Sequence, residues 1–279
     1  DGQTIRQENV FANHSLFNAN LTENASDEND FLINEAINTA FAKKGPVHIN
    51  APFEEPLYET VSELTVEPKV ISATTKEFIY DEPISEYANI WNTSKKKLVL
   101  VGVNEPNAVE QKFLDKLAND PSVVVMIETT SNLHHPKFIN TIDSIITPFT
   151  HEDFLDFQPE ILVTFGGMIV SKRIKAFLRK YKPTHHWHID DLRAYDTFDC
   201  LTKHFEVQPN LFFQSFFMLT EMVESNYNQY AQDIKALRQK RSLEYLAKIP
   251  FTDFKVFEKL IPALPKNSQL QISNSSPIR

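Results

Sequence analysis

Four short strand-like runs, spaced along the middle of the chain, constrain its fold more than any other feature. They are KLVLVGV at 97–103, SVVVMI at 122–127, EILVTF at 160–165 and THHWHI at 184–189. Continuous apolar runs of this length are typical of parallel strands that are buried on both faces. Helical patterns at 107–119 and 171–181, and a shorter element at 140–146, lie between them. This alternation predicts an α/β fold with a doubly wound, mostly parallel sheet.

The N-terminal part carries a second, smaller pattern of helix and strand. Ser26 is a good N-cap residue, and apolar residues follow it at helical spacing over 27–43. Gly45 is expected to stop this helix, and the β-branched run at 47–50 then predicts a strand. Residues 1–21 are rich in Asn and are expected to be irregular.

The remaining segments connect and follow these patterns. Residues 52–94 hold four prolines and many acids, which predicts a linker that drapes over a domain surface. Helices are predicted at 211–222, 227–249 and 254–260, the last stopped by Pro262, with a strand at 268–272. The predicted division is 1–59 for the end of a first domain, 60–95 for the linker, 96–222 for a central α/β domain, and 223–279 for linker helices and the start of a third domain.

Composition excludes several classes of protein. The net charge is −9 with both signs dispersed, unlike the basic surface of a nucleic-acid-binding protein. No apolar run approaches the roughly 20 residues that a membrane-spanning helix needs. The single cysteine, Cys200, excludes an intramolecular disulfide and a cysteine-rich zinc site. It is expected to be structural, and it fits a reducing compartment such as the cytoplasm.

The segment GGMIVSKR, at 166–173, combines features of an anion site. It lies where a parallel strand ends and a helix begins, which is the usual ligand position in open α/β sheets. A helix N-terminus favours anions, and Lys172 and Arg173 add two cations. The segment is neither a GxGxxG fingerprint nor a P-loop. The alternative interpretation is a tight turn with a solvated Lys-Arg pair.

Histidines in and near the fourth run are weaker candidates. Strand alternation places His186 and His188 on one face, with His185 on the other. Metal binding is one interpretation, and hydrogen bonding within a buried sheet is the more common one. The carboxylates at 190–191 lie where a Rossmann-like sheet holds a ribose, which gives an adenosine site as a further alternative. The pair at 134–135 is expected to be a solvated loop pair.

Three further segments are only polar turns or strand ends when considered alone. They are GQTIRQ at 2–7, GPVHINAPFEEPLY at 45–58 and NSSPIR at 274–279. Together they resemble the thiamine-diphosphate (ThDP) enzymes, and most closely the family of 2-succinyl-5-enolpyruvyl-6-hydroxy-3-cyclohexene-1-carboxylate synthases of menaquinone biosynthesis. GPVHIN alone suits several ThDP enzymes, whereas HINAPFEEPLY with GQTIRQ upstream is much narrower. The resemblance covers the whole chain and implies that 1–59 ends a pyrimidine-binding domain and that 223–279 leads into a diphosphate-binding domain.

The resemblance implies substrate-binding roles for five residues. Gln3 matches a family glutamine that faces the cofactor and the substrate, although glycine precedes it here where the family often has Asn. Lys172 and Arg173 match a pair that meets the carboxylates of isochorismate. Ser275 and Arg279 match the family segment Asn-Ser-x-x-x-Arg, whose Ser and Arg bind substrate. Arginine suits this task because it can bind a carboxylate bidentately.

The resemblance also implies a transferase activity. In this family ThDP supplies the chemistry that decarboxylates 2-oxoglutarate and adds the succinyl-semialdehyde carbanion equivalent to isochorismate in a 1,4-addition. The activating glutamate and the Gly-Asp-Gly…Asn motif for Mg2+ that the family needs do not occur in this sequence. We therefore expect no catalytic residue, no metal site and no bound ThDP in this chain.

The ends of the chain lead to a related expectation. The sequence begins at Asp1 rather than at a methionine and stops at Arg279, directly after a strand-like run. We expect a piece of a longer, homo-oligomeric, cytoplasmic enzyme, inactive when isolated. Two alternatives stay open. Another ThDP-dependent 2-oxoacid decarboxylase would not need isochorismate, and a nucleotide-binding or structural α/β module would have no ThDP chemistry. The low glycine count, five in 279 residues, argues against the nucleotide-binding module.

Overall fold

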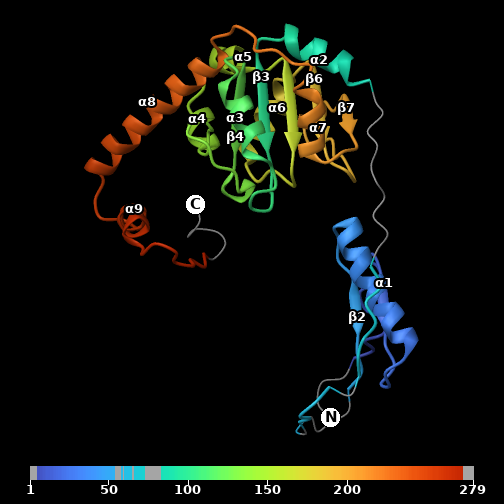
Figure 1. Ribbon diagram of the computed structural model, residues 1–279. Helices are drawn as coiled ribbons and strands as arrows, with labels where there is room; N and C mark the ends of the chain where they lie inside the picture. The colour runs from blue at the N-terminus through green and yellow to red at the C-terminus, as the bar shows by residue number, and fades with distance from the viewer. Residues whose placement is uncertain (1–4, 54–57, 59, 65, 73–82, 273–279) are drawn as a thin grey trace. The chain divides into compact units, whose positions relative to one another are not determined.

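The structure is a computed structural model that describes all residues except 1–4, 54–57, 59, 65, 73–82 and 273–279. The chain divides into two units, Asp1–Tyr80 and Asp81–Arg279, and each unit has its own sheet (Figure 1). The boundary between the units falls within the predicted linker, 60–95.

Unit 1 contains the helix that the sequence predicts. Helix α1 spans Asp27–Lys43, and Ser26 caps it by accepting a hydrogen bond from the Asn29 backbone N–H. The end of the helix differs from the prediction, because Lys44 rather than Gly45 takes the left-handed conformation, with φ 45°. A Cβ on Gly45 would lie 2.5 Å from Leu16 Cδ1, the end of a flexible side chain that can move aside.

Two short parallel strands accompany α1. Strand β1 (Asn18–Asn20) pairs with β2 (His48–Asn50), and Ala19 is fully buried. The prediction that residues 1–21 are irregular was therefore wrong at β1. This strand escapes sequence analysis because it is three residues long and lacks the β-branched and aromatic residues that mark strands.

Part of the predicted linker runs along the surface of α1. The Asn34 side chain donates to Lys69 O (2.7 Å) and accepts from the Ile71 N–H (2.8 Å). One turn further along, Asn38 Nδ2 donates to Ile71 O (2.8 Å). Residues 69–71 are thus held on a polar stripe of the helix, as expected for a linker that drapes over a domain.

Unit 2 is built on a five-stranded parallel sheet. Its strands are β3 (Lys97–Val101), β4 (Val123–Ile127), β5 (Ile161–Phe165), β6 (His185–Ile189) and β7 (Lys203–Phe205). Their spatial order is β4-β3-β5-β6-β7, and every neighbouring pair is parallel. The first four strands coincide with the predicted runs, whereas β7, only three residues long, was not predicted. The predicted doubly wound α/β fold is confirmed.

Helices cover both faces of this sheet, so β3, β4 and β5 are buried along their whole length (Figure 1). The helices on one face are α4 (Ile142–Ile146), α5 (His151–Phe157), α6 (Lys172–Lys180) and the start of α8 (Tyr227–Lys248). The helices on the other face are α2 (Ile84–Thr93), α3 (Gln111–Asn119) and α7 (Pro209–Phe216). Aromatic side chains form much of the second core, where Phe213 of α7 packs against Phe165 of β5 with ring centroids 5.6 Å apart.

The core of unit 2 extends beyond the predicted central domain, 96–222. Helix α2 lies inside the predicted linker, yet its Trp91 is only 2% exposed and stacks on Trp187. The first turns of α8 belong to the same unit, because Tyr227 is buried and its hydroxyl donates to Phe157 O (2.9 Å). Assignment of the flanking segments to pyrimidine-binding and diphosphate-binding domains stays a prediction.

The C-terminal segment differs from the prediction in three details. Helix α7 ends at Phe216, whereas the sequence predicts a helix as far as residue 222. Helix α9 (Asp253–Ala263) continues one residue past Pro262, where the sequence predicts a stop. Residues 268–272 form no strand, so that prediction was wrong. A strand needs a partner for its backbone N–H and C=O groups, and this segment pairs with no strand in the part of the chain that the structure describes.

Candidate functional site

The carboxyl ends of β3 and β5 form the topological switch point of the sheet. The chain leaves β3 for β4 on one side and then passes to β5 on the other side of β3. Ligands of doubly wound sheets usually bind in the crevice at such a point. In this protein, the backbones of the two strand ends contact each other at that point.

Glycines bring the two strand ends into direct contact. The Gly102 N–H donates to Phe165 O (2.9 Å), and the Gly167 N–H donates to Val103 O (2.7 Å). A Cβ on Gly102 would lie 1.8 Å from the Gly167 carbonyl oxygen, so no other residue fits at position 102 without displacing the neighbouring backbone. The hydrogen-bonded ladder between the two strands therefore continues to Val103 and Gly167.

Lys172 and Arg173 form the first turn of α6, shortly after this contact. Ser171 is the N-cap, and its hydroxyl accepts a hydrogen bond from the Ile174 N–H (3.2 Å). Ile174 and Phe177 bury one side of the helix against the core, and both cations are exposed. Within the described part of the chain, neither cationic side chain forms a hydrogen bond or an ion pair.

A carboxylate from another loop binds the backbone directly ahead of α6. Glu128, which follows β4, accepts hydrogen bonds from the Val170 N–H (2.8 Å) and the Ser171 N–H (2.7 Å). These two N–H groups, which precede the first turn of α6, are thus bound by a carboxylate of the protein itself. An external anion would have to bind the first turn, where Lys172 and Arg173 lie.

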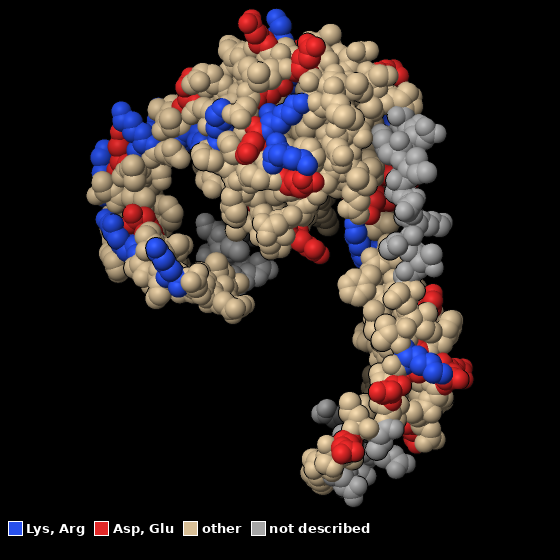
Figure 2. Space-filling view, in the orientation of Figure 1, with Lys and Arg blue, Asp and Glu red and all other residues tan. Residues whose placement is uncertain are grey.

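The surroundings of the cationic pair combine charge with exposed apolar surface. Met168 and Val170 are 76% and 65% exposed in the same loop. Lysine and arginine side chains elsewhere on unit 2 are interspersed with acidic ones in the view of Figure 2. The loop therefore suits a small ligand with carboxylates and an apolar carbon skeleton, because arginine can bind a carboxylate bidentately while the apolar side chains cover the skeleton.

Three of the five predicted substrate-binding residues cannot be placed beside this pair. Gln3, Ser275 and Arg279 lie outside the described residues. The structure therefore locates Lys172 and Arg173 only, and the roles predicted for the other three residues stay predictions.

The histidines of β6 take part in a hydrogen-bonded group within the sheet. Thr164 Oγ1 lies 2.9 Å from His186 Nε2 and 2.8 Å from His188 Nδ1. Burial lowers the pKa of His186 to about 4, and burial also lowers the pKa of His188. Both imidazoles are therefore neutral at pH 7. No group of three or more His, Cys, Asp and Glu suited to a metal ion occurs among the described residues, and the hydrogen-bonding interpretation holds.

Cys200 and the two carboxylates after β6 make local contacts. Burial raises the pKa of the Cys200 thiol to about 11, so the thiol is protonated and a poor nucleophile, as expected for a structural cysteine. Asp190 Oδ1 accepts from the Leu192 N–H (2.8 Å), and Asp191 accepts from the Gln208 amide. Both carboxylates already have hydrogen-bond donors within the protein, which does not favour a ribose site.

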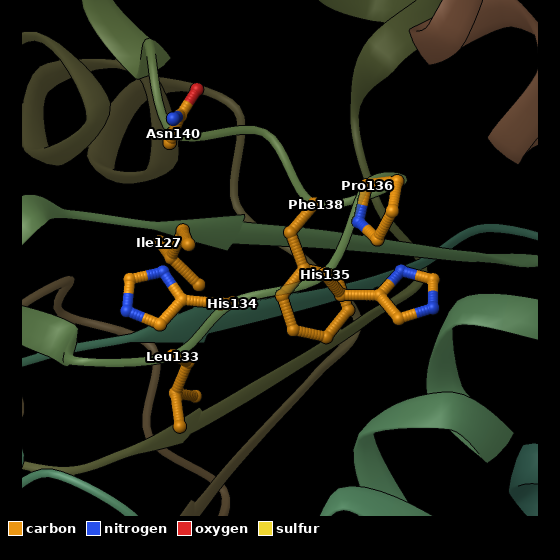
Figure 3. Close-up of a pocket in the computed structure, with 7 residues that line it drawn as sticks. All are labelled: Ile127, Leu133, His134, His135, Pro136, Phe138 and Asn140. Atoms are coloured by element: carbon orange, nitrogen blue, oxygen red, sulfur yellow. The ribbon is translucent and has the colours of Figure 1, made fainter. Parts of the chain in front are cut away.

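A pocket of about 330 Å3 lies beside the end of β4. His134 and His135 line it, and their imidazole rings point in different directions (Figure 3). The prediction of a solvated pair was wrong for His135, whose side chain is only 15% exposed. Its Nδ1 accepts from the Lys137 N–H (3.1 Å), and its Nε2 lies 3.8 Å from Asp115 Oδ1.

Comparison with known proteins identifies the family. Residues 73–272 match a family model whose description is "Middle domain of thiamine pyrophosphate". The name of this model refers to the thiamine pyrophosphate enzymes. The chain belongs to this thiamine pyrophosphate enzyme family. The match contains all of the sheet of unit 2 and both helices, α2 and α8, that extend beyond the predicted central domain.

Similar curated proteins carry the name 2-succinyl-5-enolpyruvyl-6-hydroxy-3-cyclohexene-1-carboxylate synthase. This chain is 64% identical to the protein of that name from Flavobacterium johnsoniae, 63% identical to that from Flavobacterium psychrophilum and 50% identical to that from Christiangramia forsetii. The matches cover 100% of this chain and 51%, 50% and 52% of the three relatives. The chain thus spans about half the length of the relatives it matches.

The described residues of this thiamine pyrophosphate family member do not fit a cofactor site. They supply no group of three or more His, Cys, Asp and Glu suited to Mg2+, and the ends of β3 and β5 are in direct backbone contact at Gly102 and Gly167. The expectation that this chain alone binds no cofactor stays a prediction. None of the helices in the described ranges is both long and apolar enough to span a bilayer.

Sequence reasoning missed Glu128, although the sequence contains a signal for it. The residue is acidic and comes directly after the buried run at 122–127, at the edge of the sheet where loops meet ligands. What the sequence does not reveal is its partner, because Val170 lies 42 positions further along the chain.

Proposed function

We propose that this chain is the isochorismate-binding part of a 2-succinyl-5-enolpyruvyl-6-hydroxy-3-cyclohexene-1-carboxylate synthase. Relatives of that name match the whole chain at up to 64% identity. The structural observation that carries the proposal is the Lys172-Arg173 pair, exposed at the start of α6 and without internal partners among the described residues. Cations left without partners at the carboxyl edge of a doubly wound sheet are suited to a carboxylate ligand.

The two side chains bind and orient the carboxylates of isochorismate in this proposal. Arg173 supplies a planar, bidentate donor, and Lys172 supplies a point charge. The exposed Met168 and Val170 contact the carbon skeleton. Fixing the substrate in this way lowers the barrier by orientation, while bound ThDP supplies the decarboxylation of 2-oxoglutarate and the carbon–carbon bond formation.

Other parts of the proposal concern the complete enzyme. Gln3 would contact cofactor and substrate, and Ser275 and Arg279 would bind substrate. ThDP and Mg2+ would be held by parts of the synthase outside this chain, and the enzyme would be a cytoplasmic homo-oligomer. The isolated chain would show no turnover with both substrates, ThDP and Mg2+, and measured turnover would contradict this.

The test uses a complete synthase, as long as the relatives, that contains this chain. Arg173→Ala should raise the KM for isochorismate more than about tenfold, because hydrogen bonds to charged groups contribute about 1.5–3 kcal/mol. The KM for 2-oxoglutarate should stay within about twofold of the parent value, since a residue that contacts one substrate changes the binding of that substrate. Lys180→Ala is the control, because Lys180 is exposed at the other end of the same helix.

Two results would reject this function. An unchanged KM for isochorismate in both Lys172→Ala and Arg173→Ala would remove the proposed site. Consumption of 2-oxoglutarate that does not depend on isochorismate would instead favour a 2-oxoacid decarboxylase.

A further inference from the structure

Glu128 connects two loops at the carboxyl edge of the sheet. It follows β4, an edge strand, and its carboxylate binds the loop after β5, on the far side of β3. Both carboxylate oxygens accept from the Val170 N–H, at 3.0 and 2.8 Å, and one of them also accepts from the Ser171 N–H at 2.7 Å. Hydrogen bonds to an ionised acceptor are roughly twice as strong as neutral ones.

Glu128 is itself fixed by the sheet. Its backbone N–H donates to Ser131 Oγ (2.9 Å), and that hydroxyl donates to Val101 O at the end of β3 (2.8 Å). Ser131 is fully buried. The backbone of Glu128 is therefore anchored to the end of β3, which is buried along its whole length.

The loop that Glu128 binds has little apolar anchoring of its own. Of the three residues between Gly167 and Ser171, only Ile169 is buried, whereas Met168 and Val170 are exposed. Polar contacts must therefore fix the path of the backbone into the first turn of α6. Directly ahead of Lys172 and Arg173, the backbone N–H groups of Val170 and Ser171 donate to Glu128. Two side-chain contacts accompany them: the Ser171 hydroxyl donates to the Asp143 carboxylate, and Lys175 Nζ donates to Ile169 O (3.0 Å). Glu128 is the acceptor of the backbone N–H groups.

We propose that Glu128 is a positioning residue for isochorismate binding, which acts by fixing the backbone that carries Lys172 and Arg173. This inference rests on the proposed function of the pair. Glu128 touches neither cation in the structure, and its effect on the substrate passes through the Val170 and Ser171 amides. Loss of its charge should loosen the loop and weaken binding of the substrate that the pair contacts, with little effect on the other substrate.

The experiment compares Glu128→Gln with a matched control, Glu160→Gln, in a synthase of the relatives' full length that carries this segment. Glu160 is likewise a carboxylate that accepts hydrogen bonds from two backbone N–H groups, those of Lys95 (2.6 Å) and Lys96 (3.3 Å). It lies at the amino ends of the strands, directly before β5. E128Q should raise the KM for isochorismate by about tenfold while kcat and the KM for 2-oxoglutarate change by less than about twofold. E160Q should leave all three parameters near the parent values.

A second measurement does not depend on activity. Amide hydrogen exchange of the peptide covering residues 168–175 should accelerate in E128Q and stay at the parent rate in E160Q, because exchange reports local opening. An unchanged exchange rate in E128Q would overturn the inference even if the variant were inactive for another reason.

The kinetic outcomes separate the inference from the function on which it rests. If Arg173→Ala raises the KM for isochorismate and E128Q does not, Glu128 has no positioning role and the proposed function stands. If neither Arg173→Ala nor Lys172→Ala changes that KM, the function fails and the inference fails with it. Equal increases in E128Q and E160Q would show a general loss of structure and would also overturn the inference.

Discussion

Gly102 and Gly167 approach so closely that a Cβ on Gly102 would lie 1.8 Å from the Gly167 carbonyl oxygen. The contact joins the ends of β3 and β5 and fixes the start of the loop that leads to Lys172 and Arg173. It lies at the switch point of the sheet, near which ligands of doubly wound proteins usually bind. Because of this contact, we expect a ligand to bind to side chains of the loop rather than between the two strands.

Gly102→Ala should destabilise unit 2 and displace the loop. Overpacking of a filled site typically costs about 1–3 kcal/mol, and here the obstructing atoms belong to the backbone, which cannot rotate away. Urea unfolding would measure the loss. Gly167→Ala is the matched control, because its Cβ would approach Val103 Cβ at 3.2 Å and the Val103 carbonyl oxygen at 3.5 Å, without the overlap found at Gly102. Equal stability of the two variants would contradict this account of the contact.

Lys97 should make the free energy of unfolding of unit 2 increase with pH in the alkaline range. The residue is fully buried, and its Nζ donates to Ser122 Oγ (2.7 Å) and lies 3.8 Å from Asp120 Oδ2. Burial lowers the pKa of Lys97 to about 8, although the Asp120 and Glu160 charges oppose this. Between pH 8 and 10.5 the unfolded chain therefore binds more protons, and stability rises with pH by up to about 3 kcal/mol.

Urea midpoints measured from pH 7.5 to 10 would test this. Lys97→Met should flatten the rise, because methionine has a similar volume and no charge to bury. Lys112→Met, at a site whose side chain is 62% exposed, should leave the slope unchanged. A parent protein whose stability is flat across this range would refute the assignment.

Thr164→Val should destabilise the sheet more than Thr164→Ser, which loses only a buried methyl group worth about 0.8 kcal/mol. The hydroxyl bridges His186 and His188 at 2.9 and 2.8 Å. Valine has nearly the same shape but leaves a buried imidazole nitrogen unpaired, which costs about 1–3 kcal/mol. Chemical denaturation at pH 7, where both imidazoles are neutral, would measure the difference. Similar stabilities of the valine and serine variants would show that the bridge contributes little.

The limits of the folded unit can be tested with fragments of the chain. A fragment covering 83–249 retains Trp91 and Tyr227, whereas 96–222 lacks both. Removal of a large buried aromatic side chain costs about 3–5 kcal/mol, so 96–222 should unfold at a much lower urea concentration or fail to fold. Fragment 83–222 would separate the contribution of α2 from that of α8. Equal stability of 83–249 and 96–222 would support the boundaries predicted from sequence.

Much of the fold could be predicted because its signals are local. β3, β4 and β5 appear as continuous apolar runs since helices cover both faces of the sheet. Helix α1 could be located because Ser26 supplies an N-cap immediately before a periodic segment. Strands β1 and β7, with three residues each, were missed, because so short a segment has no periodicity to detect.

The α/β class, the position of the main strands and the cationic pair at the start of a helix could all be predicted from residue order. The groups that lie beside the pair could not, because they come from a distant segment of the chain. Strand order places the loop after β4 within reach of the loop after β5, and this brings the Glu128 carboxylate to amides 42 and 43 positions away. Residue patterns report the local environment of each segment, whereas contacts between segments depend on how the strands are ordered in the sheet.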